Sequence, residues 1–530
     1  MAASVSHLRF DAFERGPQNR AVVGVSVFLI TALGLSLRLA FVGQESLWFD
    51  EAWSWRYAHL SIRALWIEAL DLHPPLYYTL QHLWLTFGES EAAIRSLSVI
   101  FGTASIPLVY LLGSSFADRR TGLISALLTA TSALQVAFSQ EARSYSLLTM
   151  MGLLVNLAMV QFLRLESNDR AKTLWVGLAY VLAILAALYT HYIAALLFVL
   201  AGVFGLLRAI QIGSIRMAGR WLGLNGLVLL GWAWWLPTVI SQAQGSVLGW
   251  RAPLTPGTAF ADLRVVFGEP LIWHFPAFAD LLLPSLAAIG IALVWRKGLS
   301  ALYLAAVALS IPAAEIAIDV AGKAIFGVRT IEWLAPIYLI FAAVPLSRLR
   351  AILALPLLAL VVGIQFNGVY HYYVVPATGY AFPHEDEPWR DVVSDLALHL
   401  CDGDVVLLSP KSMDPPFSYY FRQHARGGIT VLGIEAMGSG FLSDPRLVRV
   451  EAVNTAGIET ISESANRIWL VGRQWLDAAS AEELSKLREQ LLRGRRMVYT
   501  HVDRNLRTEL LTKGSGLDDP GCQLRPTNNR

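Results

Sequence analysis

Long apolar runs alternate with short polar segments through the first two thirds of the chain. A helix needs about 20 mostly apolar residues to cross a membrane. We identify eleven such stretches, near residues 22–43, 92–113, 121–138, 145–163, 173–190, 192–209, 221–241, 279–296, 300–320, 331–346 and 350–370. The pattern predicts an all-α polytopic membrane domain over residues 22–380, preceded by an N-terminal segment at 1–21.

The pattern changes at about residue 381. A helix and a Gly-containing turn lead into a short buried strand, and strands then alternate with helices. This alternation predicts a small α/β domain over residues 381–530. It contains no Gly-rich phosphate loop, so we interpret it as an accessory domain. Its predicted elements are the strands Val405–Leu408, Ile429–Ile434, Ile468–Val471 and Met497–His501 and the helix Ala481–Leu492.

The composition agrees with a membrane protein. Of the 530 residues, 55% are hydrophobic and 15% are charged, whereas soluble proteins average about 25% charged residues. The net charge of +2 gives no indication of nucleic-acid binding, and we expect none. We expect Cys401 and Cys522 to be unpaired, although an oxidising compartment would allow a disulfide.

Loop charges predict the orientation of the chain. If the N-terminus is cytoplasmic, Lys and Arg are about twice as frequent in the inner segments as in the outer loops. The sequence therefore predicts a multi-pass protein of the plasma (inner) membrane with segment 1–21 inside. An odd number of spans places the C-terminal domain outside the cytoplasm. The outer loops at 44–91 and 242–278 are long.

The first outer loop begins with the motif SLWFDEAWSW at residues 46–55, in which two acids lie among aromatic residues. Its apolar spacing predicts a helix lying on the membrane surface, with the aromatics as interface anchors. In one interpretation Asp50 is an N-cap and Glu51 a first-turn acid, both of which stabilise a helix start. In the other, the acids carry out chemistry.

More polar residues fall on the same predicted membrane face. Each has a structural alternative, because a lone His is usually structural and an Arg at a helix end can anchor it to headgroups. Their convergence instead favours one site at the bilayer edge, in which Glu51 and His73 could also hold a divalent ion. The candidates are Asp50, Glu51, His73, Glu141, Arg143, His191, Lys323 and Arg329.

Three segments together resemble a known group of enzymes. They are SLWFDEAWSW, the long segment beginning HPPLYYTLQHLW at His73, and FSQEARSYSLLTM at 138–150. In this order they resemble the bacterial GT-C membrane glycosyltransferases, in particular the group of protein O-mannosyltransferases and lipid A aminoarabinose transferases. The resemblance covers about residues 22–200 well and weakens toward the C-terminus.

The resemblance implies a GT-C-like fold and an inverting transfer outside the cytoplasm. The donor would be a hexose or pentose on a polyprenyl phosphate, and the acceptor a lipid, a glycan or a protein. By position, Asp50 would be the catalytic base, Glu51 the second acid and Glu141 the acid of the next short outer turn. His73 would lie near the donor phosphate or a metal such as Mg or Mn, and Arg329 near the phosphate.

A transporter or flippase for a lipid-linked sugar is the alternative function. Transporters commonly contain internal repeats and polar sites near the bilayer midplane. The sequence contains no repeat that we can identify, and most of its candidate residues lie at one edge. Glu315, inside the ninth apolar stretch, fits the transporter better. A further hypothesis makes the α/β domain a module that selects the acceptor.

Overall fold

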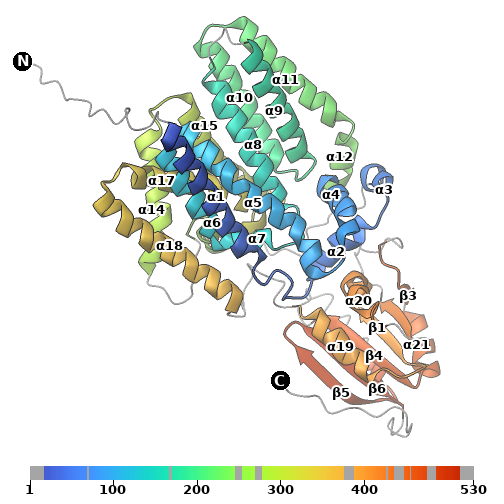
Figure 1. Ribbon diagram of the computed structural model, residues 1–530. Coiled ribbons are helices and arrows are strands. Elements are labelled where there is room, and N and C mark those ends of the chain that lie inside the picture. Colours follow the sequence, from blue (N-terminus) through green and yellow to red (C-terminus); the bar gives the residue numbers. More distant parts are fainter. Residues whose placement is uncertain are drawn as a thin grey trace, which may run out of the picture.

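The computed structural model describes residues 17–68, 71–165, 170–244, 254–268, 277–374, 387–424, 428–434, 447–453, 455–473, 485–486 and 488–513. Most of the chain up to Val374 forms a helical bundle, and the C-terminal part forms an α/β domain at one end of this bundle (Figure 1). The fold class predicted from the apolar pattern, helical membrane bundle plus small α/β domain, is confirmed.

Helices form where the sequence has apolar runs. Several begin at a side-chain cap; for example, the Asp118 carboxylate accepts the backbone N–H of Thr121 at 2.8 Å. The helices of the bundle are α1 (Pro17–Leu39), α2 (Phe49–Ala58), α3 (Ile62–Ile67), α4 (Leu76–Trp84), η1 (Leu85–Phe87), α5 (Glu91–Phe116), α6 (Arg119–Thr131), α7 (Ala133–Ser139), α8 (Tyr145–Leu163), α9 (Arg170–Leu188), α10 (Ala194–Gln211), α11 (Ile215–Ala233), α12 (Leu236–Gln244), α13 (Pro256–Gly268), α14 (Ala277–Val294), α15 (Leu299–Val320), α16 (Val328–Ile331), η2 (Glu332–Leu334), α17 (Ala335–Arg348) and α18 (Ala351–Val374).

Among the described residues, seven helices are long and apolar enough to cross a membrane. Two bent pairs, α6–α7 at 60° and α11–α12 at 64°, raise the number to nine if each pair is one span. Two other predicted stretches coincide with the shorter apolar helices α9 and α14. Every predicted stretch therefore overlaps a helix, and the chain is embedded in a membrane. The count of eleven spans stays a prediction.

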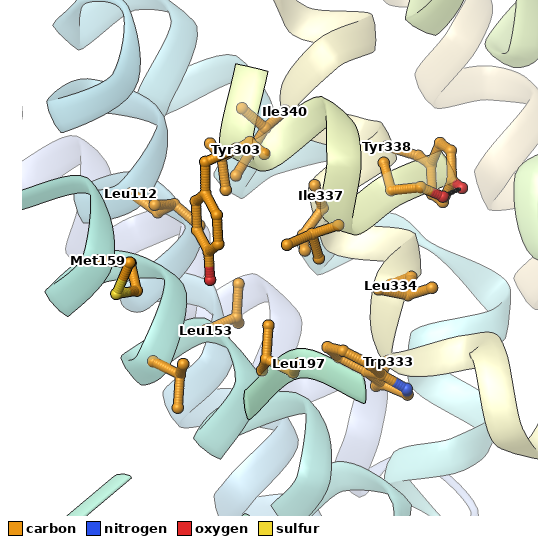
Figure 2. Close-up of a cluster of buried hydrophobic side chains, with 14 of the residues drawn as sticks. Leu112, Leu153, Met159, Leu197, Tyr303, Trp333, Leu334, Ile337, Tyr338 and Ile340 are labelled. Carbon is orange, nitrogen blue, oxygen red and sulfur yellow. Dashed lines mark hydrogen bonds between the residues drawn. The ribbon is translucent and has the colours of Figure 1, made fainter. Parts of the chain in front are cut away.

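The centre of the bundle is a large apolar cluster (Figure 2). Leu112 of α5 and Met159 of α8 lie near Tyr303 of α15, while Trp333 and Ile337 come from η2 and α17. All five side chains are buried. This packing joins helices that are far apart in the sequence, so it fixes the relative positions of the loops at the helix ends.

The C-terminal domain is a mixed sheet with helices. The strand order is β3-β2-β1-β4-β6-β5; β1 to β4 are parallel, and the hairpin β5–β6 is antiparallel to β4. The elements are α19 (Trp389–His399), β1 (Val405–Ser409), η4 (Lys411–Met413), α20 (Asp414–Phe421), β2 (Thr430–Ile434), β3 (Glu451–Val453), α21 (Thr455–Ser464), β4 (Arg467–Arg473), β5 (Arg496–Asp503) and β6 (Leu506–Thr512).

The four predicted strands correspond to β1, β2, β4 and β5. The predicted helix at 481–492 lies partly outside the described residues, and its described part at 488–492 is helical. The sequence did not predict β3 and β6, because β3 is very short and β6 follows its hairpin turn directly. The expectation of unpaired cysteines is wrong for Cys401, which is disulfide-bonded. Cys522 lies outside the described residues.

The α/β domain packs directly against the first outer loop. One apolar cluster includes Ala52 and Trp55 of α2 together with Trp389, Phe417 and Trp469 of the C-terminal domain. Figure 1 shows α20 next to α2. The cores of the two domains are therefore continuous around α2, the helix that carries the two acids of the opening motif.

Candidate functional site

Asp50 lies in the first turn of α2, with its side chain 28% exposed. Its carboxylate is 3.5 Å from the guanidinium of Arg329, whose side chain is 34% exposed. Arg329 also stacks on the Trp48 ring, 4.6 Å from the ring centroid. A partly exposed carboxylate therefore lies beside a cation that can be approached by a ligand, and both groups keep part of their hydrogen-bonding capacity.

The opening motif forms a helix, but the predicted position of that helix is wrong. Trp48, Trp53, Trp55 and Tyr57 are all buried inside the protein and are not anchors on the membrane surface. The N-cap is Trp48, so Asp50 is not the capping residue. The reason is the α/β domain and the second half of the loop, which cover both sides of α2 and bury its aromatic residues.

Glu51 has no exposed surface, and its carboxylate is fully engaged. Arg95 of α5 donates from Nε to Oε1 at 2.8 Å and from Nη2 to Oε2 at 2.6 Å. The backbone N–H groups of Ala142 and Trp48 donate to the same two oxygens. Two-point pairing of this kind is among the stronger side-chain interactions. Both oxygens of Glu51, the second acid predicted to be catalytic, are thus occupied by hydrogen bonds from Arg95 and the backbone.

Arg95 also binds the backbone of the segment that precedes α2. Its other hydrogen bonds go to the carbonyls of Val42, Glu45 and Ser46, so the five guanidinium N–H donors are all used. The segment that leads into α2 is therefore held to α5. This arrangement fixes the start of α2 and, with it, the position of Asp50.

Arg143 connects Asp50 with the second half of the first outer loop. The side chain is buried between α2 and α4. Its Nη1 lies 3.4 Å from the Asp50 carbonyl, 3.2 Å from Ser54 Oγ and 3.3 Å from the Tyr78 hydroxyl, and its Nη2 lies 3.5 Å from His73 Nδ1. Arg143 therefore brings a positive charge close to Asp50.

His73 forms a small polar cluster with Asp71, Tyr78 and His191. Its Nδ1 lies 3.5 Å from an Asp71 carboxylate oxygen that also accepts the Tyr78 hydroxyl, and its ring centroid is 5.5 Å from that of His191. Burial opposes ionisation of Asp71, but the neighbouring His73, Arg143 and Tyr78 lower its pKa overall. Burial, His73 and Arg143 lower the pKa of His191 to about 3, so its imidazole is neutral at pH 7.

Glu141 is the most unusual acid of the site. The side chain is 1% exposed, and neither carboxylate oxygen has a hydrogen-bond partner among the described residues. Burial raises the pKa of Glu141 to about 8, against the opposing effect of Arg329. The adjacent carboxylates Glu51 and Asp50 raise it further. Glu141 therefore holds a proton at neutral pH. A cation or a hydrogen-bond donor that approaches its carboxyl group would favour loss of this proton.

Seven of the eight predicted residues lie in this one neighbourhood, connected by the contacts above. Lys323 is the exception. Its Nζ donates to the Ala243 carbonyl at 3.2 Å, at the end of α12. Glu315 is buried within α15, and it does not take part in the contacts described above.

The predicted metal pair of Glu51 and His73 does not fit a divalent ion. Both Glu51 oxygens are taken by Arg95 and backbone N–H groups, and His73 Nδ1 faces Asp71 and Arg143. Within the described part of the chain, no three His, Cys, Asp or Glu side chains are grouped to hold a metal.

The α/β domain contributes Glu387 to the surroundings of Asp50. The buried Glu387 carboxylate accepts the backbone N–H of Phe49 and the Trp389 indole N–H, both at 2.9 Å, and pairs with Arg473. Arg473 stacks on the Phe49 ring at 4.4 Å. The tyrosine hydroxyl of Tyr420 accepts the Leu47 N–H at 2.6 Å. Two contacts from the accessory domain therefore hold the backbone on either side of Trp48.

Sequence reasoning missed Asp71, Tyr78, Arg95 and Glu387. Asp71 has a signal, because it lies two residues before His73 in the same loop. Arg95 also has one, since an Arg inside a predicted span is costly and is normally paired. Glu387 has none, because it lies 338 residues from its partner Phe49.

A family model matches part of the chain. Residues 72–235 match the dolichyl-phosphate-mannose-protein mannosyltransferase family. This segment contains His73, Glu141, Arg143 and His191 and ends before Arg329. No curated protein matches the chain in sequence.

Solved structures match nearly the whole chain in fold. ArnT from Cupriavidus metallidurans bound to undecaprenyl phosphate has a TM-score of 0.62 at 14% identity, covering 92% of this chain and 98% of that one. The oligosaccharyltransferase AglB from Archaeoglobus fulgidus, in complex with an inhibitory peptide and a dolichol-phosphate, has a TM-score of 0.54 at 12% identity, covering 86% of this chain and 70% of that one. The chain therefore has the fold of the GT-C membrane glycosyltransferases, as its motifs predict.

Proposed function

We propose that the protein is an inverting glycosyltransferase that moves a sugar from a polyprenyl-phosphate donor to an acceptor hydroxyl, with Asp50 as the general base. The observation that carries this proposal is the partly exposed Asp50 carboxylate beside the partly exposed Arg329 guanidinium. The fold shared with ArnT and AglB, whose structures contain undecaprenyl phosphate and dolichol-phosphate, supports a lipid-linked donor.

The chemistry follows from these two groups. The acceptor oxygen attacks the anomeric carbon while the bond from that carbon to the donor phosphate breaks, and the phosphate keeps the electron pair. Asp50 takes the hydroxyl proton, which contributes rate enhancements of roughly 10²–10⁴-fold in comparable enzymes. In this proposal Arg329, which pairs with Asp50, and Arg143, which binds the Asp50 carbonyl, stabilise the phosphate charge as it develops. A single displacement of this kind inverts the sugar carbon.

The other groups have supporting roles in this proposal. Glu51 positions the start of α2 through Arg95, and to His73, Glu141 and His191 we assign contacts with the donor sugar or phosphate. Lys323 would contribute only at the end of α12, where it binds the Ala243 carbonyl. Phosphate charge is met by guanidinium groups here. A Mg or Mn requirement is a separate prediction, which a chelator added to the transfer assay checks.

The orientation is also part of the proposal. We place the site and the α/β domain outside the cytoplasm of the plasma (inner) membrane. The charge bias of the loops supports this placement. The disulfide at Cys401 supports it as well, since disulfides persist mainly in oxidising compartments.

A lipid-linked sugar transporter is the second candidate, favoured by Glu315 buried within a span. Purified protein in detergent separates the two functions, because transfer needs no sealed compartment and transport does. Transfer of labelled sugar from a polyprenyl phosphate in detergent supports the enzyme. Its absence for every donor, together with uptake of the lipid-linked sugar in proteoliposomes, would support the transporter. A gene deletion that accumulates one polyprenyl-phosphate sugar would name the donor.

A further inference from the structure

A cavity of about 420 Å³ lies among helix ends far from Asp50. Four cations from different helix ends line it: Arg164, Arg208, Lys297 and Arg348. Gln211 and Ser300 add polar groups, and none of the described lining residues is acidic. Segment 166–169 lies outside the described residues. The cavity is therefore partly open to its surroundings and is lined by several positive side chains from separate elements, of which Arg164, Lys297 and Arg348 are exposed.

The cavity lies at the opposite membrane surface from the proposed active site. α5 begins near Glu51, which pairs with Arg95, and ends at Phe116, which lines the cavity. With 26 residues, α5 is about 39 Å long at 1.5 Å per residue. That length exceeds the roughly 30 Å hydrocarbon thickness of a bilayer. The loop charges predict that this surface is the cytoplasmic one.

Two of the four cations have contacts that explain part of their placement. Arg164 donates to the Phe116 carbonyl at 2.8 Å, and Arg208 donates to the Leu165 carbonyl at 3.1 Å, so both also satisfy helix C-termini. The positive-inside bias explains why cations are frequent at this surface. It does not explain their convergence on one cavity.

The other two cations keep their donors available. The side chains of Lys297 and Arg348 make no hydrogen bond or ion pair with the described residues. Arg208 Nε is buried and has no hydrogen-bond partner among the described residues. Guanidinium and ammonium groups arranged in this way suit a phosphate, which accepts several N–H donors at once.

We propose that this cavity binds the phosphate of an anionic membrane phospholipid. A lipid is favoured over free phosphate because the cavity lies at the membrane surface, where basic residues attract anionic headgroups. Its apolar lining residues Phe116, Leu163 and Leu299 would contact the glycerol and upper acyl region. The lipid would join the ends of α5, α8, α10, α15 and α17. This inference does not depend on the proposed transfer reaction.

Lipid binding by the full-length protein in detergent tests the proposal, with phosphatidylglycerol, phosphatidylcholine and inorganic phosphate as probes in native mass spectrometry. We expect the protein to retain phosphatidylglycerol in preference to phosphatidylcholine. The double variant Lys297→Gln/Arg348→Gln should lower the phosphatidylglycerol affinity by roughly 30-fold, since each cation near a membrane surface contributes about fivefold.

A matched control is available in the neighbouring sequence. Arg296 and Arg350 lie next to Lys297 and Arg348 and are exposed as they are, but they do not line the cavity. Arg296→Gln/Arg350→Gln should change the affinity by less than about threefold. If the first double variant does not fold, each single variant should lower the affinity by roughly fivefold. Equal losses in both double variants would overturn the proposal. So would binding of inorganic phosphate without preference for phosphatidylglycerol.

Discussion

The two adjacent acids of α2 lie in regions with opposite properties. The rim region contains Asp50, Trp48 and Arg329, where one carboxylate and one guanidinium are partly exposed and loosely paired at 3.5 Å. The core region contains Glu51 and Arg95, where the carboxylate is fully buried and bound at two points. A base must be reached by its substrate and must have a free lone pair. Only the rim acid meets both conditions.

Two acids that are neighbours in sequence can therefore have separate roles, one in stability and one in the proposed reaction. The core region holds the start of α2 to α5, and the rim region carries the proposed base on that backbone. Accurate placement matters for catalysis, because small displacements of a reacting group lower the rate strongly.

Breaking the core region should have the largest effect on stability. Glu51→Gln leaves Arg95 buried without its counter-charge, and breaking a buried ion pair in this way costs about 3–5 kcal/mol. We expect a large drop in the thermal unfolding temperature in detergent. A variant as stable as the wild type would show that the Glu51–Arg95 pair does not hold α2 in place.

Changing the cation of the rim region should lower turnover with little effect on stability. Arg329→Gln removes charge next to the leaving phosphate, and loss of one such group commonly lowers kcat by roughly 10²–10³-fold. The Asp50 pair is partly exposed, so its loss should cost at most about 1 kcal/mol of stability. Arg329→Lys keeps the charge and should recover part of the rate. Full activity of Arg329→Gln would exclude Arg329 from the site.

Glu141, a buried acid whose pKa responds to Arg329 and Asp50 of the rim region, should make the stability of the protein depend on pH. Its pKa in the folded protein is raised to about 8 from the usual 4.5. Its stabilising contribution is thus complete below about pH 4.5 and is lost as the pH rises through 8. Relative to the wild type, Glu141→Gln should therefore gain roughly 4 kcal/mol of stability between pH 5 and pH 8.5. Thermal unfolding at both pH values measures this; identical pH dependence in both proteins would contradict the raised pKa.

The smallest expected effect comes from the α/β domain. Glu387→Gln weakens the hydrogen bond that Phe49 donates next to Asp50 and also removes the charge that pairs with the partly exposed Arg473. Loss of about 1 kcal/mol there should lower kcat by about fivefold and leave KM for the donor unchanged. Arg422→Gln is the control, because it breaks an exposed pair with Glu89 at the same interface, 34% and 37% exposed. If both variants lowered kcat equally, Glu387 would only help to hold the α/β domain against the bundle and would not position Asp50.

Much of this arrangement could be predicted from the sequence, because apolar periodicity places helices and therefore sorts loops onto two membrane faces. Asp50, His73, Glu141 and Arg143 converge as expected for that reason. What could not be predicted depends on packing between distant segments. Arg95 pairs with a residue 44 positions away, and Glu387 binds one 338 positions away. Local sequence patterns predict neither of these two pairings.

The burial of the aromatic residues of α2 could not be predicted either. An aromatic-rich segment after a span is typical of a membrane-surface helix. The same segment is equally suited to packing against a domain, and here Trp55 contacts Tyr419 of α20 with ring centroids 5.1 Å apart. The pattern specifies that apolar surface must be covered, but it does not specify whether lipid or protein covers it.

If Asp50 is the base, turnover of Asp50→Asn in the detergent transfer assay should fall strongly. Asn keeps the size of the side chain and removes its ability to accept the hydroxyl proton. We predict a decrease in transfer of roughly 10²–10⁴-fold, with an unfolding temperature close to that of the wild type because Asp50 is partly exposed and weakly paired. Near-normal turnover in a correctly folded Asp50→Asn protein would contradict the account.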